Sequence, residues 1–373
     1  MEKNSAQDVS ESRAVGRSPV RVNRDDVFAA YRGLLSRDPE SEAAVAARVN
    51  RDYSCYAEFL ETFVRSAEFR NRVRPRVASE FFFSILDAKN LILRHEDKSR
   101  SARPDCFVNF LGVATKAAYI DRLSSLAGQV EAPPIPSNCH AEMVEWAAAL
   151  RAVELARERF VVVELGAGWG CWLVNTIIAA KRLGLAAYGI GVEGDEGHVE
   201  FLREHCENNG VEKSEYEVRK VVAGAKSGVA LFPVMADSSK SYGQEPQFFS
   251  SRRAAASFQN SSNSQWSVTP IQALETVISD KRRVDLLHID IQGGELDLVK
   301  GSMSVLRNKV AYIVIGTHSR AIDGELIAAL RGAGWILEFE KPTTFVSNAA
   351  GELVTTLDGT QGWRNPWLTA RAA

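Results

Sequence analysis

The sequence predicts a doubly wound α/β fold with an antiparallel pair of strands at its C-terminal edge, preceded by a helical N-terminal region. Two observations support this expectation. From Phe160 onward, short β-branched runs alternate with helical segments, as they do in parallel sheets joined by crossover helices. Between Asp25 and Arg76, apolar residues instead recur at helical spacing.

The N-terminal third divides into a leader and a helical domain. Residues 1–22 are polar, lack the apolar segment of a secretory signal, and are expected to be a disordered leader. Residues 23–105 are expected to form a helical domain, because Val27 and Tyr31 begin a helical period that a second stretch, 56–73, continues. This domain is expected to end in a linking helix and a charged connection.

The remaining residues, 106–373, are expected to form the α/β domain. The run FVVVELG, which begins at Phe160, reads as a strand buried on both faces. Further strands are expected at 186–193, 215–223, 284–291 and 310–317, and the segments 335–342 and 351–359 are expected to pair as the antiparallel edge. The polar segment 236–267 is too long for an ordinary loop and is either disordered or functional.

Composition excludes several classes of protein. The 373 residues carry a net charge of −2, so no global basic surface for nucleic acid is expected. No apolar run approaches the roughly 20 residues that a membrane span requires. The five cysteines are scattered without a C-x-x-C pair, which argues against a disulfide framework or a zinc site and favours a reducing cytoplasm.

The strongest motif, E-L-G-A-G-W-G, runs from Glu164 to Gly170 between an expected strand and an expected helix. Glycines Gly166, Gly168 and Gly170 allow a tight turn and a close approach of a ligand. Backbone N–H groups at the helix start favour a carboxylate or a phosphate. Trp169 adds an aromatic face beside the loop. The spacing departs from the G-x-G-x-x-G of dinucleotide-binding proteins, although an NAD-dependent oxidoreductase remains an alternative.

A second acid supports a ligand at this loop. Glu193 ends the next expected strand and Gly194 follows it. An acid about 20 residues beyond the glycines is placed to accept hydrogen bonds from ribose hydroxyls. Asp195 is expected to cap the helix that begins near His198.

A third motif follows the expected strand 284–291 and reads D-I-Q-G-G-E from Asp290 to Glu295. With the glycine loop, it resembles the FkbM-type methyltransferases, over about residues 161–340. The stretch after the third strand is also similar, and the resemblance implies that Val222 borders the adenine of the donor. The resemblance further implies a class I methyltransferase fold, S-adenosylmethionine as donor and, in many bacterial members, a sugar hydroxyl as acceptor. The N-terminal helices resemble a small bacterial helical domain of unknown function.

Methyl transfer to a hydroxyl profits from a general base. His318 follows a strand at the ligand-binding edge of the sheet and is the first candidate for base or substrate ligand. The other candidates are Asp290, which also has a donor-binding role, His140, which precedes the helix leading into the sheet, and His288, which lies deeper in its strand, where a core role is favoured. No metal is expected; if one were bound, Asp290, Glu295 and His318 would be the ligands for Mg²⁺.

We therefore expect an S-adenosylmethionine-dependent O-methyltransferase acting on a hydroxyl of a sugar, a glycolipid precursor or a glycosylated natural product. The partner is then a small-molecule or glycan acceptor, without nucleic acid or a membrane span. The second alternative is a catalytically inert scaffold that docks glycan-modifying enzymes. Assembly into a homo-oligomer, or docking through the N-terminal helices, stays open.

Overall fold

The computed structural model describes residues 20–35, 37–66, 68–69, 82–240, 242–249, 251–261, 265–348 and 350–370. The chain folds as two compact units, of which one ends at Ala78 and the other begins at Ser79. Apart from residues 20–22, the expected leader lies outside the described residues. Among the described residues, no helix combines the length and the apolar character needed to cross a membrane.

The N-terminal unit is helical, as expected. Its described elements are α1 (Arg24–Ala30), the π-helical turn η1 (Tyr31–Leu35), α2 (Glu42–Val49) and α3 (Tyr56–Val64). Asn23 and Asp26 form a reciprocal capping box that fixes the start of α1. Tyr31, Phe59 and Phe63 are buried in its core, which confirms the helical period read from the sequence.

The second unit begins earlier than the expected boundary at residue 106. Its first elements are β1 (Phe83–Ser84), α5 (Ala88–Arg94), β2 (Cys106–Val108), β3 (Ala114–Lys116), and the 3₁₀ turns η2 (Ala117–Tyr119) and η3 (Asp121–Leu126). Strand β1 pairs with the edge of the main sheet. Leu91 and Ile92 of α5 are buried in the same core as the helix that precedes the sheet, so their apolar contacts tie this segment to the α/β unit.

An eight-stranded sheet forms the centre of the second unit, with the order β1-β13-β16-β12-β11-β4-β5-β6. The new strands are β4 (Arg159–Leu165), β5 (Ala186–Glu193), β6 (Tyr216–Lys220), β11 (Leu286–Ile289), β12 (Tyr312–Thr317), β13 (Ile336–Lys341) and β16 (Gly359–Arg364). Strands β12, β11, β4, β5 and β6 run parallel. The doubly wound α/β fold with an antiparallel C-terminal edge is therefore confirmed.

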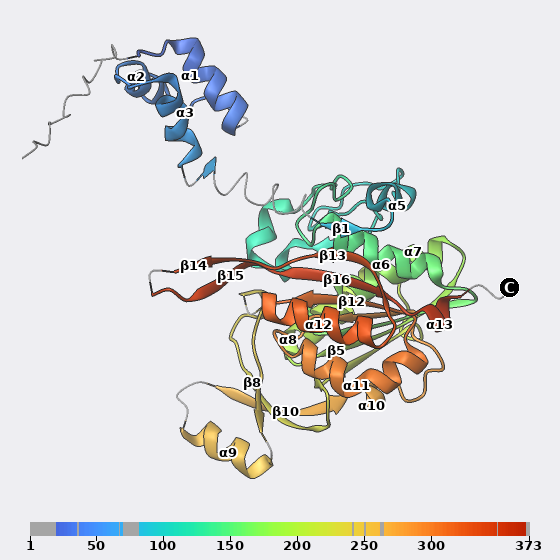
Figure 1. Ribbon diagram of the computed structural model, residues 1–373. Helices are drawn as coiled ribbons and strands as arrows, with labels where there is room; N and C mark the ends of the chain where they lie inside the picture. The colour runs from blue at the N-terminus through green and yellow to red at the C-terminus, as the bar shows by residue number, and fades with distance from the viewer. Residues whose placement is uncertain are drawn as a thin grey trace, which may run out of the picture. The chain divides into compact units, whose positions relative to one another are not determined.

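Helices cover both faces of this sheet (Figure 1). On one face lie α6 (Met143–Leu155), α7 (Cys171–Arg182) and α8 (Glu196–Asn208); on the other lie α10 (Leu274–Val277), α11 (Glu295–Lys309) and α12 (Arg320–Gly332). Phe160 and Val162 of β4 pack toward the first face, whereas Val161 and Val163 pack toward the second. Burial on both sides explains the continuous β-branched run of this strand.

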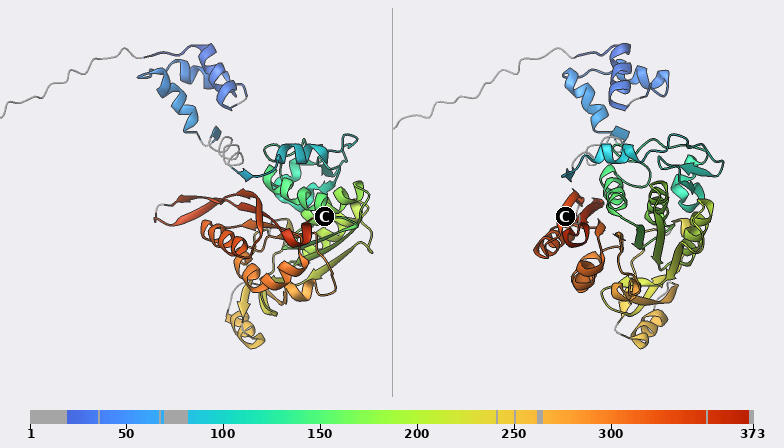
Figure 2. Two further views of the ribbon diagram at one scale, coloured as in Figure 1. Left: turned by 45° about the vertical axis from the view of Figure 1, so that its right-hand side comes forward. Right: turned by 90° about the vertical axis from the view of Figure 1, so that its right-hand side faces the viewer.

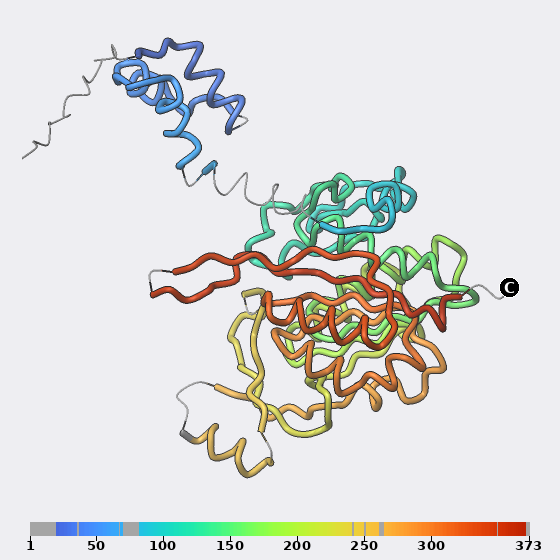
Figure 3. The backbone as a smooth tube through the Cα atoms, viewed as in Figure 1, coloured from blue at the N-terminus to red at the C-terminus, as the bar shows by residue number. Residues whose placement is uncertain are grey.

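The antiparallel edge differs in its pairing from the expectation. Strand β13 pairs with β16, not with the segment 351–359, and β16 lies between β13 and β12. Gly362 makes this insertion possible, because a Cβ there would lie 2.9 Å from the Cβ of Ala148 in α6. Strands β14 (Thr344–Ser347) and β15 (Leu353–Leu357) form a separate hairpin that extends beyond the sheet (Figure 3), and α13 (Pro366–Thr369) follows β16.

A smaller sheet of order β7-β10-β8-β9 lies beside the main one (Figure 2). It comprises β7 (Val222–Gly224), β8 (Gly228–Pro233), β9 (Gln247–Phe249) and β10 (Trp266–Ala273). The described part of the polar segment 236–267 contains regular structure, namely η4 (Ser238–Lys240), β9, α9 (Arg252–Ser261) and the start of β10.

Candidate functional site

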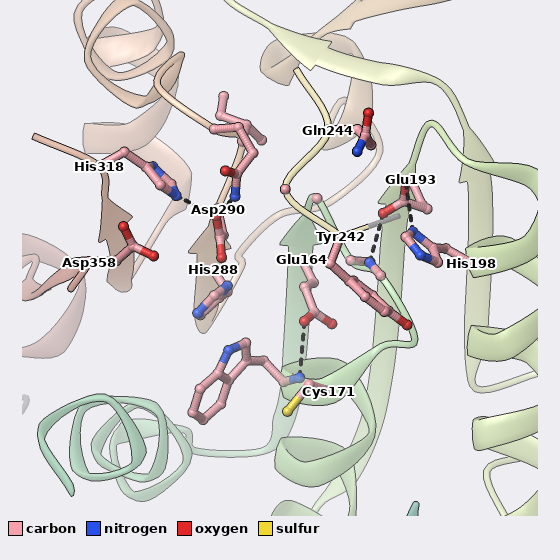
Figure 4. Close-up of a pocket in the computed structure, with 18 of the residues that line it drawn as sticks. Glu164, Cys171, Glu193, His198, Tyr242, Gln244, His288, Asp290, His318 and Asp358 are labelled. Carbon is pink, nitrogen blue, oxygen red and sulfur yellow. Dashed lines mark hydrogen bonds and ion pairs between the residues drawn. The ribbon is translucent and has the colours of Figure 1, made fainter. Parts of the chain in front are cut away.

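A cavity of about 560 Å³ opens at the carboxyl ends of the parallel strands. It is lined by Glu164 of β4, Glu193 of β5, Asp290 after β11 and His318 after β12. Figure 4 shows His318 and Asp290 toward one end of the cavity and Glu193 toward the other. The structure therefore brings together side chains that are more than 150 residues apart in the sequence, as expected of strand ends in an open α/β sheet.

The glycine loop has the backbone that its sequence requires. Gly166, Gly168 and Gly170 have φ values of 75°, 52° and 74°, a region that side chains disfavour. A Cβ on Gly166 would lie 1.9 Å from the carbonyl oxygen of Asp290, and one on Gly170 would lie 2.8 Å from Leu202. Gly166 and Gly168 line the cavity, whereas Gly170 does not and instead makes room for α8.

Glu164 stabilises the helix after the loop. Its carboxylate accepts hydrogen bonds from the backbone N–H groups of Trp172 (3.0 Å) and Leu173 (2.8 Å) at the start of α7. The side chain is only 2% exposed, and burial raises its pKa to about 7. Both carboxylate oxygens thus accept hydrogen bonds from the start of α7. Glu164 therefore fixes the position of the helix that follows the glycine loop.

Glu193, at the end of the neighbouring strand β5, also holds the loop in place. Its Oε2 accepts a hydrogen bond from the N–H of Gly168 (2.7 Å), and its Oε1 accepts one from the N–H of Asp195 (2.8 Å). The expectation that Asp195 caps α8 is confirmed, since its side chain accepts from the N–H of His198. A carboxylate has about four lone-pair sites, so Glu193 keeps acceptor capacity for further hydrogen-bond donors.

The other predicted donor-site residues also line the cavity. Trp169 contacts the ring of Tyr242 edge-to-face, with 5.2 Å between ring centroids. A Cβ on Gly194 would lie 2.8 Å from the ring of Phe232. Val222 packs in one apolar cluster with Phe232, so these two residues form an apolar wall beside Glu193.

His318 lies between two carboxylates. Its Nε2 is 3.3 Å from Asp290 Oδ1, and its Nδ1 is 3.0 Å from Oε1 of the fully buried Glu295. Burial by itself would lower the pKa of His318, but pairing with the two carboxylates outweighs it and raises the pKa to about 10. The pairing therefore favours the protonated ring, in which each nitrogen faces a carboxylate oxygen. The general-base role suggested by the sequence needs a neutral ring, which this pairing disfavours.

His140 lies in the wall of the cavity. Its Nδ1 is 3.7 Å from the Sγ of Cys171, and its ring packs against Phe107 and Trp169. Burial lowers the pKa of His140 to about 3, so the ring is neutral near pH 7. Its Nε2 has no hydrogen-bond partner among the described residues.

The ligand atoms of Asp290, Glu295 and His318 lie within 4.8 Å of one another, a spacing that would suit a metal ion. The ion pairs of His318 account for the same spacing, and Glu295 does not line the cavity. A second group of this kind contains Glu131, Cys139 and His140. There, burial raises the pKa of the Cys139 thiol, which disfavours the thiolate that a metal would need.

Sequence reasoning missed several residues of the cavity. Tyr242 and Gln244 come from the polar segment 236–267, whose length was its only functional signal. The Tyr242 ring stacks on His198 at 4.2 Å, and its hydroxyl donates to the carbonyl oxygen of Tyr119. Glu142, Glu145, Lys341 and Asp358 also line the cavity, and nothing in their local sequence marks them.

Comparison with known proteins adds a family match to this geometry. Residues 165–357 match the model of the methyltransferase FkbM domain. The chain is 40% identical, over 280 residues, to a protein of Jannaschia sp. (strain CCS1) named "Putative methyltransferase"; the match covers 73% of this chain and 97% of that protein.

Solved structures show more distant likeness. The FkbM methyltransferase of Methylobacillus flagellatus KT is 13% identical with a TM-score of 0.35, and the match covers 58% of this chain and 53% of that one. A precorrin-6y C5,15-methyltransferase of Geobacter metallireducens GS-15 is 9% identical with a TM-score of 0.34, over 60% and 88% of the two chains.

Proposed function

The chain belongs to the FkbM methyltransferase family, and we propose that it transfers a methyl group from S-adenosylmethionine to a hydroxyl oxygen of a sugar, a glycolipid precursor or a glycosylated natural product. The observation that carries this proposal is the glycine loop. Its residues Gly166 and Gly168 line the cavity, and the N–H of Gly168 donates a hydrogen bond to Glu193. Membership of a methyltransferase family argues against the alternative of an NAD-dependent oxidoreductase.

The cavity suits the donor in size and in chemistry. Its volume of about 560 Å³ falls in the range of small-molecule and cofactor sites. Gly166 and Gly168 would allow the methionine portion to approach the backbone, Glu193 would accept from the ribose, and Val222 would border the adenine. When bound, S-adenosylmethionine supplies a methyl group already activated by the positive charge on sulfur.

The opposite end of the cavity favours an acceptor that carries hydroxyl groups and no negative charge. Four acidic side chains line this part of the wall: Glu142, Glu145, Asp290 and Asp358. Two of these four acidic groups have a basic partner: Lys341 pairs with Glu142 at 2.7 Å, and His318 pairs with Asp290. The wall therefore carries more acidic than basic groups. Carboxylates accept hydrogen bonds from sugar hydroxyls, whereas they repel phosphate or carboxylate groups.

Asp290 and His318 are placed to orient the acceptor. Asp290 accepts a hydrogen bond from Gln292 and pairs with His318, so its position is fixed on two sides. The protonated His318 would donate to an acceptor oxygen, and Asp290 would accept from a hydroxyl. Holding the reacting oxygen in line with the methyl group is a large part of the catalysis that such a site can provide.

The donor is tested by calorimetric titration of the full chain with S-adenosylmethionine. We expect a dissociation constant near micromolar, about −8 kcal/mol. Gly168→Val should abolish the binding, because side-chain carbons would enter the ligand-facing side of the loop, where the Tyr242 ring is already 3.4 Å from the Cβ position. Gly210→Val is the control, since Gly210 also has a positive φ but has open space around it. Equal affinity in the wild type and Gly168→Val would contradict the proposed donor site.

The acceptor is tested with methyl-labelled donor and a panel of p-nitrophenyl glycosides, with glucose 1-phosphate as the anionic comparison. Transfer to a neutral glycoside and none to the phosphate is expected from the acidic wall. Donor binding without transfer to any hydroxyl compound would favour the inert docking scaffold instead.

Removal of metal should change little. Dialysis against EDTA is expected to leave methyl transfer within about twofold, because the His318 ring occupies the space between Asp290 and Glu295 and offsets part of their charge. The same samples are assayed after addition of Mg²⁺. Loss of transfer on dialysis and its recovery with Mg²⁺ would make Asp290, Glu295 and His318 metal ligands and would contradict the ion-pair description.

A further inference from the structure

The proposed reaction releases the proton of the acceptor hydroxyl, and most proton acceptors in the cavity are already engaged. Glu164 accepts from two helix N–H groups, and Glu142 pairs with Lys341. Asp290 is shared between His318, which is itself protonated, and Gln292. His140 has a thiol and not a carboxylate beside its ring, with Nδ1 3.7 Å from the Sγ of Cys171, and Asp358 is exposed to solvent.

His288 differs from all of these groups. It lies in β11, lines the cavity and is only 2% exposed. Its Nε2 is 3.0 Å from Oε1 of Glu145, and its Nδ1 has no hydrogen-bond partner among the described residues. The ring stacks on Trp172, with 5.1 Å between centroids and 25° between planes, which fixes its orientation. In Figure 4, His288 lies close to Asp290.

Glu145 determines which nitrogen of His288 carries the proton. It belongs to the first turn of α6, a helix that packs against β11 and β12 of the main sheet. An ionised carboxylate only accepts, so the hydrogen bond between the two side chains requires a proton on Nε2. With the proton on Nε2, the lone pair of Nδ1 is left free. A histidine oriented by a carboxylate, with its second nitrogen unoccupied, is the arrangement of a general base.

We propose that His288, oriented by Glu145, is the residue that takes up the hydroxyl proton of the acceptor at Nδ1 during methyl transfer. This rests on the proposed function. The O–H bond of the acceptor breaks and its proton binds the Nδ1 lone pair, while the oxygen forms a bond to the methyl carbon and the electron pair of the breaking S–C bond returns to sulfur. Glu145 stabilises the resulting imidazolium, which returns its proton to solvent after the product leaves.

The tautomer is tested without any acceptor, by nitrogen NMR of the full chain carrying isotope-labelled histidine. The signals of His288 are identified by their loss in His288→Gln. We expect an unprotonated Nδ1 and a protonated Nε2 at neutral pH, and exchange between the two tautomers in Glu145→Ala. A protonated Nδ1 in the wild type would overturn the proposal, whether or not the chain binds S-adenosylmethionine.

The catalytic role is tested by turnover of the glycoside that the wild type methylates. His288→Ala should lower kcat by about 10² to 10³ while donor affinity, measured by calorimetry, changes less than about threefold. Added imidazole should raise the kcat of His288→Ala by at least about tenfold, because the space left by the side chain beside Trp172 can hold an imidazole molecule. A smaller loss of kcat, or a loss that imidazole does not repair, would reduce His288 to a packing role.

The matched control is His95→Ala. His95 is also buried beside a glutamate, with its Nε2 3.3 Å from Glu154, but it does not line the cavity. Its replacement should leave kcat unchanged and insensitive to imidazole. Failure of the wild type to bind S-adenosylmethionine would refute the proposed function and would be seen separately in the calorimetry.

Discussion

Replacing Gly166 by alanine should destabilise the α/β unit by about 3–5 kcal/mol, because two penalties add at this position. The first is the backbone conformation, since φ is 75°. The second is the approach of β11, because the new Cβ would lie 1.9 Å from the carbonyl oxygen of Asp290. The ends of β4 and β11 must then separate, and Asp290 moves with them.

Thermal unfolding measures the loss of stability in Gly166→Ala, and calorimetric titration with S-adenosylmethionine measures the loss of donor binding. We expect a melting temperature lower by roughly 10 °C and donor binding below detection. Gly184→Ala is the control: its φ is 80°, but nothing lies within 4 Å of the added Cβ. It should lose only about 1 kcal/mol and keep its donor affinity. Similar losses in the two variants would show that the close approach of Asp290 contributes little.

The sheet could be predicted because its signal is local. Each parallel strand is buried on both faces, so its own sequence is continuously apolar, as in Phe160 to Leu165. The edge strand β16 could not be predicted in the same way. Its sequence, G-T-Q-G-W-R, has little strand character, and its place between β12 and β13 depends on the fit of Gly362 against α6.

The residues proposed to bind the donor could be located in the sequence more readily than those proposed to face the acceptor. Glycines after one strand and an acid at the end of the next form a pattern with fixed spacing, so Gly168 and Glu193 could be paired in advance. The acceptor half combines Glu145 of α6 with His288 of β11, which are 143 residues apart. No local pattern reports such a contact.

The surroundings of His318 are a second example of contacts that a local sequence pattern does not reveal. The sequence places this histidine at a strand end, which made a general base a reasonable hypothesis. It does not show that Glu295 reaches the same ring from the first turn of α11. Two carboxylates around one imidazole favour its protonated form, which bears on the chemical role that the residue can have.

The pairing of His318 should make stability depend on pH above neutrality. Its folded pKa, raised to about 10, lies above the ordinary value of 6.5. The ion pairs therefore contribute fully below about pH 6.5, and their contribution is lost as the pH rises through about 10. For a largely buried histidine, this amounts to the order of 3–5 kcal/mol. Urea denaturation between these two pH values should show a falling stability in the wild type and a flatter dependence in His318→Gln.

His205→Gln separates this effect from the titration of other groups. His205 is fully buried, and burial lowers its pKa to about 4, so its protonation opposes folding only in acid. The variant should keep the alkaline slope of the wild type, whatever its overall stability. If His318→Gln keeps that slope as well, His318 is not held as an imidazolium between Asp290 and Glu295. It would then be a neutral ring near pH 7, and a candidate for the same proton as His288.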